Sequence, residues 1–344
     1  MNCNTFSRIR RYAAVLIASL IMQLMLSGCY HAQTEKPAAP AQTVEVNVPS
    51  GFSEPPVVQS EQESESGQMV KQSATFLFFS DTQPDPETGD YTGFGELLAQ
   101  ALASQKRPDM VVFGGDTVND GGDEEEWLDF CESAGAQLDG LITAAVAGNH
   151  DSYPLLAEQF DYPLDAPLEH GGGYFYTISV APVFFVMLDS NVMGMADEAN
   201  IEWLRGELQS EAAIQSDWIV VVMHHPMWPV SDIPKDLERA ETMREHFLPL
   251  FEEYGVALIL CGHQHVYSRT LPMSGAASDS NGRGIVQIMA ASGDKATYVI
   301  GESGYIAAVA PAPNYLRIAA DSSSLEVTAY DSDGNVVDQV SIRE

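Results

Sequence analysis

Five short apolar runs, rich in Val, Ile and Phe, recur along the chain, and polar residues follow each of them directly. The runs are TFLFF from Thr75, MVVF from Met110, LITAAVA from Leu141, WIVVVM from Trp218 and ALILC from Ala257. Continuous apolar runs of this length predict strands that are buried on both faces. Polar residues at the end of every such strand predict a functional site where the strand ends gather.

Helical patterns separate the predicted strands, at residues 95–105, 124–134, 199–210 and 236–254. Strands that alternate with helices indicate an α/β fold. After Ile285 the pattern changes to strands alone, with LRIAA, LEVTAY and VVDQVSI separated by a Ser-rich turn and a DSDGN turn. We expect this C-terminal segment to form antiparallel strands with a structural role.

The N-terminus has the pattern of a signal peptide. Three arginines precede an apolar run of 15 residues, 12–26. A membrane-spanning helix needs about 20 residues, so this run is more typical of a cleaved signal. It ends in LSGC, which resembles the lipobox of bacterial lipoproteins and implies a lipid on Cys29. The alternative is an ordinary cleaved signal with an incidental cysteine.

The next segment, residues 30–72, is rich in Pro, Gln, Glu, Ser and Ala and has no hydrophobic periodicity. Such a composition predicts a disordered tether. The expected organisation is therefore a lipoprotein signal peptide (1–28), a lipidated cysteine with its linker (29–72) and one catalytic domain (73–344). The lipid would anchor that domain to a bacterial membrane outside the cytoplasm.

Composition limits the classes of function. A chain of 344 residues with 45% hydrophobic content can bury a sizeable core. Its 16 Lys and Arg residues stand against 49 Asp and Glu residues, so we expect no docking of nucleic acid. Four cysteines are too few for a disulfide framework. A bridge between Cys131 and Cys261 is left open, although two buried thiols are favoured, and nothing indicates the oligomeric state.

The polar residues that follow the predicted strands include five of the eight histidines in the chain. The set comprises Asp81, Gln83, Asp116, Asn149, His150, His224, His225, His263 and His265. Imidazole and carboxylate together suit Mn, Fe, Zn or Ni, and a carboxylate can bridge two ions. The pattern therefore predicts a binuclear metal site.

The motifs SDTQ, GGDTVND, GNHD, HHP and GHQHVY occur in this order. With them the chain resembles the calcineurin-like metallophosphoesterases, and more narrowly the bacterial members that are similar to purple acid phosphatases. The resemblance covers nearly all of the expected catalytic domain. It implies an α/β/β/α sandwich with a mixed β core and C-terminal antiparallel strands.

The resemblance also implies ligands for two divalent or mixed-valence ions. Asp116 would bridge them, with Asp81 and His265 completing one shell and Asn149, His224 and His263 completing the other. In the HHP motif the family's ligand stands two places before the proline, which selects His224; His225 then either reaches the substrate or caps the strand end. Gln83 stands where many members have His, so its amide oxygen is a candidate ligand whose participation is open.

His150 is similar to the family's histidine that contacts the phosphate and protonates the leaving group. The expected activity is hydrolysis of small phosphate esters, with a metal-bridging hydroxide as nucleophile and His150 as general acid. Asn119 stands where purple acid phosphatases have a tyrosine, so we expect no purple colour. Tyr267 and Arg269 flank the motifs, and we expect them mainly to pack.

Two alternatives to an enzyme remain. One is a surface-binding lipoprotein that keeps the fold but has little or no turnover, and the other is a structural lipoprotein without metal. Within the enzyme class the sequence does not choose between a monoesterase, a diesterase and a nucleotide hydrolase. Specificity in such a fold lies in loops, and the candidates are 152–173, 191–200 and 229–239.

Overall fold

The computed structural model describes residues 72–343 apart from 85–86, 104–105, 161–174, 192–195, 280–281, 283, 296 and 302. The expected signal peptide, the lipid attachment at Cys29 and nearly all of the expected tether lie outside the described residues. Within the described part, no helix is both long and apolar enough to cross a membrane.

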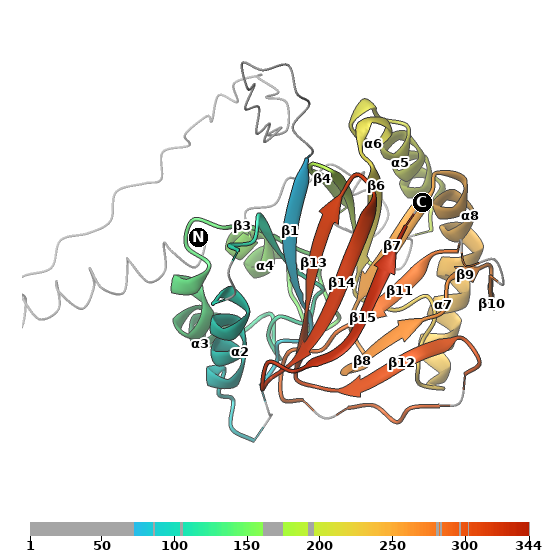
Figure 1. The fold of residues 1–344 in the computed structure, drawn as a ribbon. Coiled ribbons are helices and arrows are strands. Elements are labelled where there is room, and N and C mark those ends of the chain that lie inside the picture. The colour runs from blue at the N-terminus through green and yellow to red at the C-terminus, as the bar shows by residue number, and fades with distance from the viewer. Residues whose placement is uncertain are drawn as a thin grey trace, which may run out of the picture.

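Two β-sheets packed face to face form the middle of the molecule (Figure 1). The first sheet has the order β15-β14-β13-β1-β2-β3. Its strands are β1 (Ser73–Phe79), β2 (Met110–Phe113), β3 (Ile142–Ala145), β13 (Asn314–Asp321), β14 (Ser324–Asp331) and β15 (Val336–Ile342). The first three are parallel, and β13 to β15 add antiparallel strands, which confirms the expectation for the C-terminal segment.

The second sheet has the order β12-β8-β11-β7-β6-β5-β4. Its strands are β4 (Tyr176–Val180), β5 (Val183–Leu188), β6 (Trp218–Met223), β7 (Val256–Cys261), β8 (Val266–Thr270), β11 (Val286–Met289) and β12 (Ile306–Pro311). Strands β5, β6, β7 and β11 are parallel, and the others pair antiparallel at the edges. A small hairpin, β9 (Met273–Ser274) and β10 (Ala277–Ser278), lies beside this sheet.

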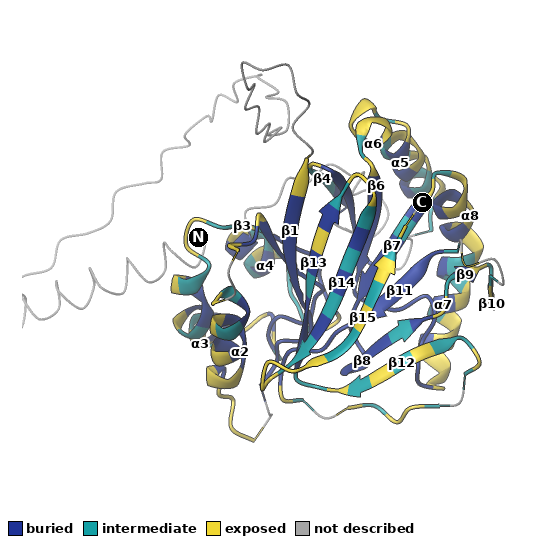
Figure 2. Ribbon diagram, in the orientation of Figure 1, coloured by how far each residue is buried: buried dark blue, intermediate teal, exposed yellow. Residues whose placement is uncertain are grey.

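Helices cover the outer face of each sheet. The first sheet carries α2 (Thr92–Leu102), α3 (Glu124–Ala134), the 3-10 turn η1 (Gly135–Gln137) and α4 (Tyr153–Phe160). The second carries α5 (Glu198–Leu208), α6 (Glu211–Gln215), α7 (Pro234–His246) and α8 (Leu248–Glu253). One buried cluster lies between the sheets and one under each helix layer. Figure 2 shows much of the strand ribbon in the colour of buried residues. The expected α/β/β/α sandwich with a mixed β core is confirmed.

The structure differs from the expected elements in the helix predicted at 236–254. This segment forms two helices, because Pro249 has no N–H to donate and its ring would collide with the preceding turn, so α7 ends and α8 begins around Phe247. The prediction also missed β5, although its run VFFVML has the same apolar character as the predicted strands. The motif-bearing strands divide between the two sheets, so their ends meet at the junction of the sheets.

The two cysteines of the described region lie on opposite sides of the sandwich. Cys261 belongs to the cluster under the helices of the second sheet, and Cys131 to the cluster under α2 to α4. Both sheets separate them, so they do not pair. Cys261 is a free, buried thiol, as expected.

Candidate metal centre

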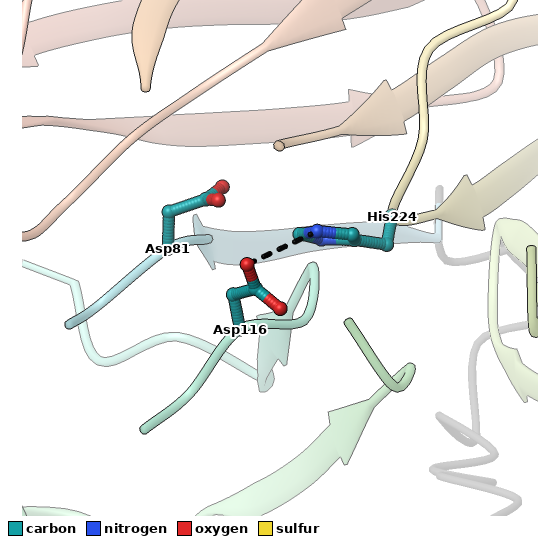
Figure 3. Close-up of side chains that lie close together, drawn as sticks. All are labelled: Asp81, Asp116 and His224. Carbon is teal, nitrogen blue, oxygen red and sulfur yellow. Dashed lines mark ion pairs between the residues drawn. The ribbon is translucent and has the colours of Figure 1, made fainter. Parts of the chain in front are cut away.

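Three of the expected ligands come together from three strands. Asp81 follows β1, Asp116 follows β2 and His224 follows β6, and ligand atoms of all three lie within 4.8 Å of one another (Figure 3). Nε2 of His224 is 3.4 Å from Oδ2 of Asp116. All three residues are at most 1% exposed. Carboxylates and an imidazole are thus concentrated in a space from which water is largely excluded.

The GHQH motif, which follows β7, contacts Asp81 of the same cluster. The backbone N–H of His263 donates to both carboxylate oxygens of Asp81, at 3.0 and 2.9 Å. Nε2 of His265 lies 3.4 Å from Oδ1 of Asp81. The two histidines and the carboxylate therefore belong to one cluster, as expected.

Four of these residues hold an unusual backbone conformation. The φ angles of Asp81, Asp116, His263 and His265 are 49°, 51°, 79° and 48°, and these are the non-glycine residues with positive φ in the described part of the chain. The left-handed region costs a residue with a Cβ about 1 kcal/mol or more. Such strain is typical of functional sites, and here it is concentrated at four of the expected ligands.

Two motif glycines allow the ligand loops to approach each other. A Cβ on Gly148, in GNHD, would lie 2.1 Å from Oδ1 of Asp116, and a Cβ on Gly262, in GHQH, would lie 2.1 Å from Oδ2 of Asp81. No side chain fits at such distances. These glycines therefore permit the close backbone contact on which the cluster depends.

Hydrogen bonds fix which ring nitrogen of each histidine is available. Nδ1 of His224 lies 2.9 Å from the carbonyl oxygen of Gly114, and Nε2 of His263 lies 3.0 Å from Oδ1 of Asp236. The other nitrogens, Nε2 of His224 and Nδ1 of His263, are buried without a hydrogen-bond partner. A metal-bound histidine usually makes a hydrogen bond through one ring nitrogen and binds the ion through the other. The two buried nitrogens without a hydrogen-bond partner therefore fit metal ligation.

Asp236 contacts the cluster, although the sequence did not reveal it. It lies at the start of α7, where its second carboxylate oxygen accepts a hydrogen bond from Nε2 of Gln264 at 2.8 Å. It thus holds the GHQH loop at two successive residues. Burial would raise the pKa of Asp236, but hydrogen bonds from His263 and Gln264 outweigh burial and lower it, so the group is ionised at neutral pH.

The remaining two expected ligands differ in their surroundings. Gln83 is fully buried, and its Nε2 donates to the carbonyl oxygen of Val118 at 3.2 Å, while its Oε1 is buried without a hydrogen-bond partner. That oxygen is free to act as a ligand. Asn149 is exposed, unlike the other expected ligands. Ligation by Gln83 and Asn149 stays a prediction.

The negative charges of the carboxylates in the cluster favour the binding of a cation. Burial would lower the pKa of His224, but the carboxylates of Asp116 and Asp81 outweigh this and raise it to about 9. Burial likewise opposes ionisation of Asp116, yet His224 holds the pKa of that carboxyl below its usual value. The carboxylates therefore attract positive charge to Nε2 of His224, the atom that a metal ion would bind.

His150 sits beside the cluster with its ring held on both sides. Its backbone N–H donates to Oδ1 of Asp116 at 2.8 Å, and its Nδ1 lies 2.6 Å from the carbonyl oxygen of Asn119. Its Nε2 lies 3.0 Å from Nζ of Lys295. Asn119 thus contributes its backbone to the site, and Lys295 is a second residue that the sequence analysis missed.

His225 caps the end of β6, which is one of the two roles left open for it. Its Nδ1 and its backbone N–H both contact Oγ of Ser190, each at 2.9 Å. Burial lowers its pKa, so the ring is neutral. Tyr298, also missed, places its ring centroid 5.2 Å from that of His265 and forms a half-buried wall at the cluster.

Tyr267 and Arg269 serve structure, as expected. Both side chains donate hydrogen bonds of 2.6 Å to Oδ2 of Asp338, which joins β8 to β15 across the two sheets.

Comparison with known proteins agrees with the fold. The family model described as calcineurin-like phosphoesterase matches residues 74–267, which include every expected ligand. The chain belongs to the calcineurin-like phosphoesterase family. Individual members of this family are less than 30% identical to this chain and match only part of it.

A probable glycerophosphodiester phosphodiesterase of Arcobacter nitrofigilis is 28% identical over 171 residues, 48% of this chain and 59% of that protein. Purple acid phosphatase 18 of Arabidopsis thaliana is 29% identical over 143 residues, 39% of this chain and 32% of that protein. The structure of a yellow lupin purple acid phosphatase has a TM-score of 0.65 at 17% identity, over 80% of this chain and 54% of that one. This chain therefore spans less than two thirds of these calcineurin-like relatives.

Proposed function

We propose that this chain hydrolyses phosphate esters at a binuclear metal site. The observation that carries the proposal is the convergence of Asp81, Asp116 and His224 within 4.8 Å, with a buried, unpartnered nitrogen on His224. When bound, two such ions supply positive charge for the phosphate and lower the pKa of a coordinated water, which gives a nucleophile at neutral pH.

Two contacts between expected ligands support the proposal of a second ion. Asp116 pairs with His224 and Asp81 pairs with His265, each at 3.4 Å. Asp116 follows β2, the strand between β1 and β3, so its carboxylate would be the one shared by two ions. Asn149, His263 and Gln83 complete the proposed set.

His150 is proposed as the general acid. The oxygen of water gives one proton to solvent and forms a bond to phosphorus while the ester P–O bond breaks. The leaving oxygen keeps that electron pair and takes a proton from Nε2 of His150, which solvent then reprotonates. The contact between Nδ1 and the carbonyl oxygen of Asn119 fixes the ring for this transfer. The products are phosphate and an alcohol. Such a positioned acid contributes about 10² to 10⁴ in rate.

The experiment compares the metal-loaded protein with Asp116→Ala on a chromogenic phosphomonoester and on a phosphodiester, with Mn, Zn, Fe and Ni in turn. We expect hydrolysis well above the Asp116→Ala baseline with at least one ion. Asp139→Ala, which removes an exposed carboxylate, is the control and should match wild type. No rate above the baseline on either ester would favour the alternative, a binding lipoprotein without turnover.

We also infer that Cys29 carries lipid and holds the chain at a bacterial membrane outside the cytoplasm. Support comes from the LSGC sequence after an apolar run. Cys29→Ala should move the protein from the membrane fraction to the soluble fraction of cells. An unchanged distribution, with the wild-type mobility retained on a gel, would contradict lipidation.

A further inference from the structure

A loop after β11 crosses the ligand-bearing loops. Its residues 292–294 donate three backbone hydrogen bonds to carbonyl oxygens of the SDTQ segment, at 2.7, 2.8 and 3.1 Å. A Cβ on Gly293 would lie 2.0 Å from the carbonyl oxygen of Gln83, so the two segments are in contact along their backbones. The contacts that hold Asp81 in place therefore also fix the position of the next residue in the loop, Lys295.

The side chain of Lys295 is half-buried and points at the proposed general acid. Its Nζ lies 3.0 Å from Nε2 of His150, whose backbone N–H is bonded to Asp116. In this contact the lysine ammonium donates and Nε2 of His150 accepts, so Nε2 can act as an acid only after the ammonium has turned to the substrate and a proton has bound in its place. The ammonium has three donors, and within the described part of the chain it has no other hydrogen-bond partner and no ion-pair partner.

A half-buried lysine without a carboxylate partner is unexpected in this chain. Acidic residues outnumber basic ones by 49 to 16, so a carboxylate partner would be expected for an ammonium drawn partly out of water. Burial lowers the pKa of Lys295, and the charges of Asp116 and Asp81 oppose that shift, which reflects how close the ammonium lies to the centre. The structure thus keeps a positive charge beside His150 with donors to spare.

We propose that Lys295 binds a non-bridging phosphoryl oxygen of the substrate and thereby selects phosphate monoesters over diesters. A monoester carries a charge of about −1.5 to −2 near pH 7, because its second pKa is about 6. A diester has one ionisable oxygen fewer and carries a single charge. The ammonium of Lys295, beside His150, therefore stabilises a bound monoester more than a bound diester. This role depends on the proposed function.

The test uses the metal-loaded full chain and Lys295→Gln, which removes the charge and keeps a donor near His150. Lys295→Arg tests rescue by a retained charge. Lys106→Met, which removes an exposed lysine 4.0 Å from Asp109, is the matched control. Two readouts are needed: kcat and KM for p-nitrophenyl phosphate and for bis(p-nitrophenyl) phosphate, and the Kd of inorganic phosphate by calorimetry.

We expect Lys295→Gln to lower kcat/KM for the monoester about 10- to 100-fold, the worth of one hydrogen bond to a charged group. Most of the loss for the monoester should come from a higher KM, and the Kd of inorganic phosphate should rise by a similar factor. The fold loss of kcat/KM for the diester should be less than about a third of the fold loss for the monoester. Lys295→Arg should recover most of the affinity, and Lys106→Met should match wild type.

Equal losses on both esters, or an unchanged Kd of phosphate in Lys295→Gln, would overturn the role of Lys295. Hydrolysis of the diester alone by wild type would overturn it too. These outcomes differ from failure of the proposed function, in which wild type does not exceed Asp116→Ala on either ester. The calorimetric measurement needs no turnover, so it tests Lys295 in that case as well. If Lys295→Gln unfolds, as its thermal midpoint would show, Lys295→Met gives the same comparison.

Discussion

Replacement of Asp236 by Asn should weaken metal binding, although Asp236 is not itself an expected ligand. The carboxylate accepts two hydrogen bonds, from Nε2 of His263 at 3.0 Å and from Nε2 of Gln264 at 2.8 Å, and it is 7% exposed. An Asn side chain of the same shape offers one acceptor, so one of the two bonds is lost and the other is no longer charge-assisted. A hydrogen bond to a charged group contributes about 1.5–3 kcal/mol.

A second line of reasoning gives the same magnitude. Loss of a group that orients a metal-bound histidine typically costs about 10- to 100-fold in metal affinity, which corresponds to about 1.4–2.8 kcal/mol. Without Asp236, His263 can turn its Nε2 inward, so Nδ1 is no longer held as the free nitrogen. We therefore expect Asp236→Asn to raise the Kd for metal by about one to two orders of magnitude.

The assay is titration of metal-free protein with Zn or Mn in competition with a chelator of known affinity. Asp123→Asn is the matched control, because Asp123 also lies at a helix start, and its carboxylate accepts the backbone N–H of Glu125 at 2.8 Å rather than a hydrogen bond from an expected ligand. That variant should bind metal like wild type. The reasoning is refuted if Asp236→Asn keeps a Kd within about twofold of wild type while Asp116→Ala loses binding.

Two further predictions concern the proposed general acid, His150, and the contact between the two sheets at Asp338. His150→Asn should lower kcat about 10²- to 10⁴-fold for an alkyl phosphate and much less for p-nitrophenyl phosphate, whose leaving group needs no proton; equal losses in steady-state kinetics would exclude the acid role. Asp338→Asn should lower the free energy of unfolding by about 1.5–3 kcal/mol at pH 7, because Arg269 Nε and Tyr267 OH each bond Asp338 at 2.6 Å. Burial would raise the pKa of Asp338, but these bonds outweigh it and lower the pKa. The difference between wild type and Asp338→Asn in urea unfolding should therefore be full above about pH 5 and shrink as the pH falls below about 4, the pKa of an unfolded aspartate; a difference that stays constant down to pH 3 would contradict this.

The ligand loops could be predicted from the sequence because each motif follows its apolar run directly. Asp81, Asp116 and His224 lie within three residues of a strand end, so the strand pattern locates them. Asp236 and Lys295 could not be found in this way. They contact groups 27 and 145 residues away in the chain, from a helix start and from a loop that carry no motif.

The division of the strands into two sheets was also beyond the apolar pattern. Strands β2 and β6 are both buried along their whole length, and their sequences, MVVF and WIVVVM, have the same character. Sheet membership depends on pairings between distant segments, such as β1 with β13, which a local pattern does not encode. The break at Pro249 was by contrast visible in the sequence and should have ended the predicted helix.

The four left-handed ligand positions set stability against activity. Glycine adopts positive φ without the penalty that Asp81, Asp116, His263 and His265 incur. Exchange of one of these residues for glycine would therefore remove the backbone penalty together with the side chain on which the cluster depends. At these four positions the backbone penalty and the placement of the side chain are therefore inseparable.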